Sequence, residues 1–181
     1  MIVLRESNLT QDELLALLCA ARAHRERDWL MILVAYWHGL RASEVVNLKA
    51  HSVTDGFITV RRLKKSLKTT QQLIRHPNPL LDEGALAEYA RNQSGNQRLF
   101  PVSRVQFWRL IQRYAGASGL PKRKAHPHAL KHTIAIQTIH SAGIENTRQW
   151  LGHKSMASTG EYLRVSDQDA GKAVQKALGG V

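Results

Sequence analysis

The apolar run WLMILVAYW, residues 29–37, limits more than any other feature how this chain can fold. In a helix of this sequence the apolar side is wide, so other elements must cover the helix on most of its faces. The run is too short for a membrane span, which needs about 18 apolar residues, and Gly39 is placed to end the helix. We therefore expect a buried central helix that acts as scaffold, and no membrane partner.

The other helical patterns along the chain are placed to cover such a scaffold. A chain of 181 residues can form one domain with a full core and is short for two. Thr10 to Glu13 reads as a capping box, Asp28 as the cap of the central helix, and Ser43 and Ser103 as caps of later helices. The helices expected besides the central one cover residues 11–24, 44–48, 80–90, 103–114, 129–141 and 144–151, and a further one, capped by Ser155, is expected to carry Tyr162.

A different pattern begins at Asp55-Gly56, where two β-rich runs flank a basic turn. FITV at residues 57–60 and QQLI at 71–74 predict a hairpin, with a third strand expected before it. The fold class is therefore α+β and mostly helical, with a small antiparallel sheet at one edge.

The charge of the chain favours a polyanionic partner. Lys and Arg number 26 against 14 Asp and Glu, which gives a formal net charge of +12. DNA or RNA is the default partner for such an excess, although charge alone does not separate an enzyme from a passive binding protein. Cys19 is the only cysteine, so an internal disulfide is excluded and a reducing compartment is expected.

The stretch from His126 to Tyr162 carries the residues best suited to chemistry. His128 and Lys131 lie three positions apart, on one side of the first turn of a helix whose N-terminus suits an anionic group. Gly152-His153 presents an imidazole at a glycine turn, and Tyr162 follows nine residues later. Converging on one anion, these groups would form a site for nucleophilic attack on phosphorus.

Several residues in these patterns also have ordinary interpretations. Arg41 follows the glycine that ends the central helix, where it is either a solvated surface arginine or a planar fork for phosphate. The histidines at 126, 128 and 132 could bind metal, but acidic residues and cysteine are absent nearby, so no metal site is expected. Residues read as structural or merely exposed are His24, His38, His51 and His140, and those read as core are Tyr36, Tyr89 and Tyr114.

The ordered motifs resemble the catalytic domain of the tyrosine recombinases, the phage integrase family. That family carries a G-L-R-x-S-E-x-x-x-L box, an H-x-x-R box, L-G-H, and a tyrosine about nine residues later. The chain reads Gly39 to Leu48, His128 to Lys131, Leu151 to His153, and Tyr162. One position departs, because Lys131 stands where the family has its second arginine. The arrangement is most similar to short members such as the fimbrial-switch recombinases.

The resemblance implies site-specific DNA recombination, by integration, excision or inversion, without a cofactor. Arg41 and His153, helped by Lys131, would neutralise the phosphate oxygens while Tyr162 forms a 3′-phosphotyrosine. His128 would assist proton transfer. Lys64 matches best the lysine that protonates the leaving 5′ oxygen, and the register of the hairpin leaves Lys65 and Lys68 as rivals.

The resemblance also implies domains and partners. Residues 1–9 are expected to be an extension, 10–165 the catalytic domain, and 166–181 a tail that docks on a neighbouring protomer. The family's N-terminal core-binding domain is expected to be absent, either because the chain is a fragment or because it is a short member. We expect double-stranded DNA as partner, a tetramer on DNA or a monomer in isolation, and a nucleoid-associated location in the cytoplasm of a bacterium or in its phage. The DNA contacts expected from charge are Arg61, Arg62, Lys65, Lys68, Lys122, Arg123 and Lys124.

Lys131, in place of the family's arginine, leaves alternative functions open. A lysine retains the charge but lacks the bidentate fork of arginine. The enzyme would then be slow, or degenerate and mainly a sequence-specific DNA-binding protein, or the lysine is an introduced substitution. A type IB topoisomerase-like enzyme would share the chemistry without needing a specific site.

Overall fold

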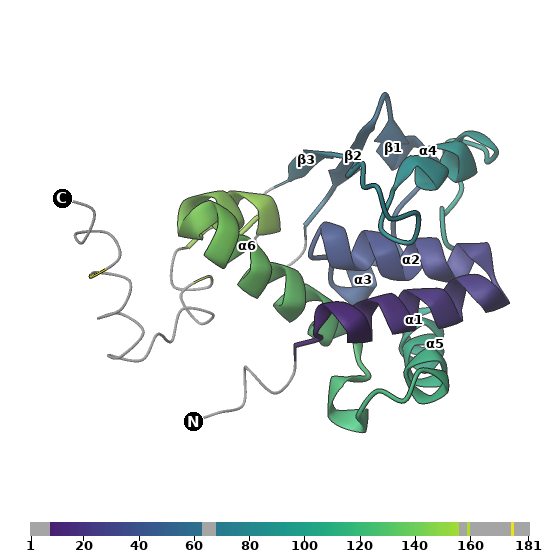
Figure 1. Ribbon diagram of the computed structural model, residues 1–181. Helices are drawn as coiled ribbons and strands as arrows, with labels where there is room; N and C mark the ends of the chain where they lie inside the picture. Colours follow the sequence, from purple (N-terminus) through teal and green to yellow (C-terminus); the bar gives the residue numbers. More distant parts are fainter. Residues whose placement is uncertain (1–7, 63–67, 156–158, 160–174, 176–181) are drawn as a thin grey trace.

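The central helix of the fold is α2 (Glu26–Trp37). The computed structural model describes residues 8–62, 68–155, 159 and 175. Every residue from Asp28 to Tyr36 is buried, so the prediction of a scaffold helix covered on most sides is confirmed. In Figure 1, α1 runs beside α2, the sheet lies above it, α5 lies below, and α6 reaches it from the side.

The helices surrounding α2 begin at the residues whose side chains cap them. Thr10 forms the predicted capping box, and Ser103, predicted as a cap, forms one too; each accepts the backbone N–H three residues later. Gly143 has φ of 81° and kinks the last helix between the two predicted segments. The bounds are α1 Gln11–His24, α3 Ala42–Val45, α4 Gly84–Arg91, α5 Arg104–Ala117 and α6 Pro127–Leu151, with short 3-10 turns at Ala50–Ser52 and Lys122–Lys124.

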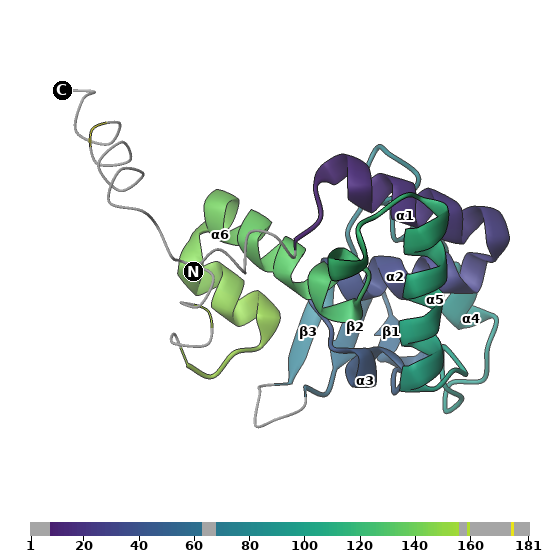
Figure 2. The ribbon, with the colours of Figure 1, turned by 90° about the horizontal axis from the view of Figure 1, so that it is seen from below.

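The sheet has three antiparallel strands in the order β1-β2-β3: β1 Val53–Thr54, β2 Phe57–Val60 and β3 Thr69–Gln72. The third strand before the hairpin is therefore confirmed, whereas the last strand begins two residues earlier than predicted. On the buried face, Ile58 and Val60 of β2 are apolar but Thr69 and Gln71 of β3 are polar. Figure 2 shows β3 as the strand nearest to α6, so this polar face meets the end of the last helix.

Three predicted helix starts are wrong, and at two of them a side chain has another partner. Asp28 does not cap α2, which begins at Glu26, because its carboxylate accepts the Tyr114 hydroxyl at 2.6 Å. Ser43 lies inside α3, whose N-cap is Arg41. Helix α4 begins at Gly84 rather than at residue 80, since Asn78 and Asp82 bind backbone N–H groups of this segment in turns.

The aromatic assignments follow the packing around α2. Tyr36 and Tyr114 are buried as predicted, and Tyr89 is half-buried against the core. In the described part of the chain, no helix combines the length and the apolar character that crossing a membrane would take.

Candidate active site

Arg41 is held at the start of α3 by a buried carboxylate. Its backbone N–H donates to Glu44 Oε2 at 2.9 Å and its guanidinium donates to Glu44 Oε1 at 3.0 Å. The Glu44 side chain is fully buried, whereas that of Arg41 is 21% exposed. One side of the guanidinium is thus fixed inside the protein while the rest of it reaches the surface, as a clamp on an external anion requires.

Arg41 and His128 line one pocket of ≈ 400 Å³. Helix α6 enters this pocket with Pro127 at its first turn, and α5 supplies the opposite wall, where Trp108 is 47% exposed. The lining residues are Arg41, Ala42, Arg104, Val105, Trp108, Pro127 and His128. The predicted arginine and histidine therefore share a surface hollow, although they are far apart in the sequence.

Lys131 does not line this pocket and is buried, with 4% of its surface exposed. Its Nζ donates to the carbonyl oxygen of Gly39 at 2.9 Å. Burial, followed by the charges of Arg62 and Arg41, lowers the pKa of Lys131 to about 7. This shift favours the neutral amine, so Lys131 differs from an arginine in its charge state as well as in its lack of a bidentate fork.

His153 follows Gly152, which adopts the left-handed conformation that ends α6. The imidazole is buried, and its Nδ1 lies 3.0 Å from Thr159 Oγ1. Burial, followed by the positive charges of Lys131 and Arg41, lowers the pKa of His153 to about 4. At neutral pH the ring is therefore uncharged and would act on an anion as a hydrogen-bond donor rather than as a cation.

Arg62, one of the predicted DNA contacts, is buried inside the protein. Its side chain is fully buried, and its guanidinium donates inward to the backbone carbonyls of His38, Gly39 and Trp150. It also approaches Glu44 Oε2 at 3.5 Å. A buried arginine with these partners does not reach DNA, so the prediction for Arg62 is wrong.

The remaining predicted residues have different surroundings. Lys124, at the end of the second 3-10 turn, binds Glu13 of α1 and is half-buried. Those on the surface are Arg61, Lys68, Lys122, Arg123 and His128. Lys64, Lys65 and Tyr162 lie outside the described residues, as does the segment 166–174 of the predicted tail. The structure thus brings together Arg41, Lys131 and His153, with His128 at the shared pocket.

Two contributors had no predicted role. Glu44 stands three residues after Arg41, the spacing at which an acid reaches back to the N-cap of a helix. That spacing is the sequence signal from which the role of Glu44 could have been predicted. Trp108 lies beside the apolar stripe of α5, and a large aromatic residue off the core face is a sign of surface function.

Comparisons with known proteins identify the family of the chain. The sequence model of the phage integrase family matches residues 7–169. The tyrosine recombinase XerA of Pyrococcus furiosus is 32% identical over 183 residues, covering 94% of this chain and 61% of the relative. The Type 1 fimbriae regulatory protein FimB of Escherichia coli K12 is 29% identical over 166 residues, covering 85% and 82%.

A solved structure supports the fold. The lambda integrase dimer bound to a COC′ core site superposes with a TM-score of 0.72 at 23% identity, covering 89% of this chain and 50% of that one. The predicted α+β architecture with its small antiparallel sheet is confirmed. Because the family's sequence model extends over most of the sequence, the chain belongs to the phage integrase family.

Proposed function

We propose that this protein cleaves and rejoins DNA at specific sites, through a covalent bond to Tyr162. The observation that carries the proposal is the convergence of three residues that are distant in the sequence: Arg41, which lines the surface pocket, and buried Lys131 and His153, whose pKa values are lowered by burial and by the charge of Arg41. Only 61% of the length of the XerA relative is matched, so the activity of the whole relative is an inference for this chain. The proposed catalytic domain is 10–165.

The net charge of +12 and the pocket at Arg41 support double-stranded DNA as the partner. Arg104 and Trp108 add a cation and an exposed ring beside that pocket. The lambda integrase structure is a dimer on a core site, which supports assembly of several copies on DNA, with a tetramer as the form we propose. The place of action would be the nucleoid of a bacterial cell.

The chemistry follows from the charge states of the site. The Tyr162 oxygen would bond to phosphorus while the bond to the 5′ oxygen breaks, and that oxygen takes a proton from Lys64 or its rivals Lys65 and Lys68. The phenol proton would leave with the help of His128. Arg41 supplies a permanent charge to a non-bridging oxygen, and uncharged His153 supplies a hydrogen bond.

Covalent capture from a random pool tests this proposal and selects the target sequence in the same step. Nicked duplexes with a randomised segment are incubated with the protein, and adducts that resist denaturant are isolated and sequenced. We expect a selected sequence with wild-type protein and none with Tyr162→Phe. Tyr89→Phe is the matched control, because Tyr89 packs against the core. An adduct formed equally by Tyr162→Phe would contradict the proposal.

Lys131 favours one alternative, a DNA-binding protein with degenerate catalysis. Its amine is buried against the Gly39 carbonyl and its pKa is lowered to about 7, so its contribution to the phosphate is weakened. Selective binding of one sequence with no adduct would support that alternative. Relaxation of supercoiled plasmid without sequence preference would instead identify a topoisomerase-like enzyme.

A further inference from the structure

One buried arginine joins the two segments that carry Arg41 and His153. Arg62 Nη2 donates to the carbonyl of His38 at 2.9 Å and to that of Trp150 at 3.1 Å, and Nη1 donates to Gly39 at 3.3 Å. His38 and Gly39 precede Arg41 in the sequence, and Trp150 precedes His153. A single planar group therefore sets the separation of the two backbones.

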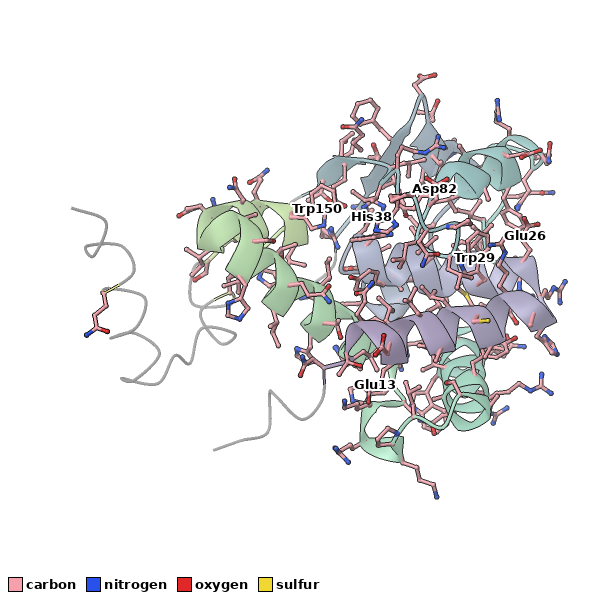
Figure 3. The ribbon with its side chains drawn as sticks, in the orientation of Figure 1. Glu13, Glu26, Trp29, His38, Asp82 and Trp150 are labelled. Atoms are coloured by element: carbon pink, nitrogen blue, oxygen red, sulfur yellow. The ribbon has the colours of Figure 1, made fainter. Side chains whose placement is uncertain are left out.

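Neighbouring side chains reinforce this junction. Gln71 accepts from Arg62 Nη2 at 3.3 Å and donates to the Trp150 carbonyl at 2.6 Å. The Trp150 ring stacks on His38 at 5.7 Å between centroids, and its Nε1 donates to the Trp37 carbonyl at 2.7 Å. Figure 3 shows Trp150 and His38 meeting where α6 reaches α2. The ends of the two helices are thus fixed by side chains that do not reach the surface pocket.

Arg62 also acts on the direction of the Arg41 side chain. Glu44 binds the Arg41 guanidinium through Oε1, and its Oε2 lies 3.5 Å from Arg62 Nη1. With Arg62 in place, the carboxylate is held between two arginines and cannot rotate freely toward either one. Without Arg62, the buried charge of Glu44 would lose one of its neighbouring cations, so its attraction for the Arg41 guanidinium would increase and would pull that side chain inward.

We propose that Arg62 is a positioning residue that fixes the geometry between Arg41 and His153 without touching DNA. Its catalytic consequence rests on the proposed function. A displacement of about 1 Å at a reacting group can cost about 100-fold in rate, so a residue at this junction should act on the chemical step rather than on DNA affinity.

The test compares Arg62→Met, which removes the donors and the charge, with Arg62→Lys, which retains a charge beside Glu44. Arg91→Met is the matched control, because Arg91 is an exposed arginine at the end of α4. On the DNA selected by covalent capture, the dissociation constant and the single-turnover cleavage rate are measured for each variant. We expect Arg62→Met to bind DNA like the wild type and to cleave about 100-fold more slowly, with Arg62→Lys in between.

A second measurement does not depend on cleavage. Hydrogen exchange should become faster in Arg62→Met at two separate segments, 36–41 and 148–153, while α1 stays protected. If Arg62→Met does not fold, Gln71→Met removes the bridge to Trp150 and should loosen the same two segments to a smaller degree.

The outcomes separate this inference from the proposed function. Wild-type cleavage rates in folded Arg62→Met, or equal losses of affinity and rate, would overturn the positioning role and leave the proposed function intact. Unchanged exchange in both segments would overturn it as well. If wild-type protein forms no adduct, the proposed function fails, and the exchange measurement alone decides whether Arg62 couples the two segments.

Discussion

The turns that carry Arg41 and His153 both contain a glycine with positive φ, but the two side chains differ in charge state. Gly39 and Gly152 have φ of 56° and 68°, a region that side-chain-bearing residues rarely adopt. The two turns also pack together, because a Cβ at Gly39 would lie 2.3 Å from the Leu151 side chain. Close packing of backbone therefore brings an arginine and a histidine to one site.

The two side chains differ in their partners. Arg41 has a carboxylate, Glu44, and remains partly exposed, so it retains its charge and can reach an external phosphate. His153 is buried near Lys131, Arg41 and Arg62, and its pKa is lowered to about 4. One turn thus presents a permanent cation and the other a neutral donor, which means that position and charge state are set by separate neighbours.

The largest expected effect separates these two roles in catalysis. Arg41→Met should slow single-turnover cleavage by about 100- to 1,000-fold, because it removes charge stabilisation at the phosphate. His153→Gln should slow it less, since an amide can still donate one hydrogen bond to the same oxygen. Cleavage of the selected duplex measures both, and a greater loss in His153→Gln would contradict the division of roles between the two turns.

The second effect concerns the packing of the turns. Gly39→Ala should lower the free energy of unfolding by about 2–4 kcal/mol, because it combines backbone strain with overlap on buried Leu151. Gly152→Ala meets the Arg62 side chain at 3.0 Å and should cost about 1–3 kcal/mol.

Gly56→Ala is the control for strain alone. Its φ is 78° and nothing lies within 4 Å of the added Cβ, so about 1–2 kcal/mol is expected. Urea unfolding monitored by circular dichroism gives all three values. A Gly56→Ala variant as unstable as Gly39→Ala would show that the turns do not depend on their mutual packing.

The third effect is a loss of stability in acid that His153 contributes. Its pKa falls from the ordinary value of 6.5 to about 4 on folding, so between these values the unfolded chain binds a proton that the folded protein does not. The free energy of unfolding should therefore decrease as the pH falls from about 6.5 to 4, by about 1–3 kcal/mol for this residue.

His153→Gln should flatten this pH dependence. His132, whose pKa burial also lowers to about 4, would still contribute in the variant, so the slope should decrease rather than vanish. Urea unfolding at a series of pH values measures the slope. Identical slopes in the wild type and in His153→Gln would show that the ring is not held neutral.

The smallest effect concerns Lys131. Its buried amine donates to Gly39 of the first turn, and its charge acts on His153 of the second. Lys131→Arg should raise the cleavage rate by at least about tenfold, because arginine retains its charge and its fork when buried. The gain should be greater at pH 8 than at pH 6, since the lysine, whose pKa is about 7, is mostly protonated only at the lower pH. Equal or lower activity of the arginine variant at both pH values would contradict the assignment.

The sequence predicted the elements whose local signals agree with their packing. The capping box at Thr10, the cap at Ser103 and the apolar run of α2 predicted three helices, and the glycine before Arg41 predicted a turn. The start of α4 could not be predicted in the same way, because Asn78 and Asp82 bind backbone groups in turns that compete with the helix.

The candidate site likewise contains residues that the sequence predicted and one residue, Arg62, that it did not predict correctly. The motifs alone predicted Arg41, His128, Lys131 and His153 as members of one site, since residue type and order are properties of the chain. Arg62 was misassigned, because an arginine in a basic run looks the same in sequence whether its guanidinium meets water or three backbone carbonyls. Its burial depends on residues 38, 39 and 150, which only the folded chain brings within hydrogen-bonding distance.

Residue order was thus sufficient to specify which chemical groups are available and which segments become helices, because capping and apolar periodicity act over a few residues. The charge states required the folded chain: the neutral imidazole of His153, the weakened amine of Lys131 and the fixed guanidinium of Arg41. Desolvation and Coulomb interactions depend on distances across the whole fold, and those distances exist only once the two glycine turns have packed together.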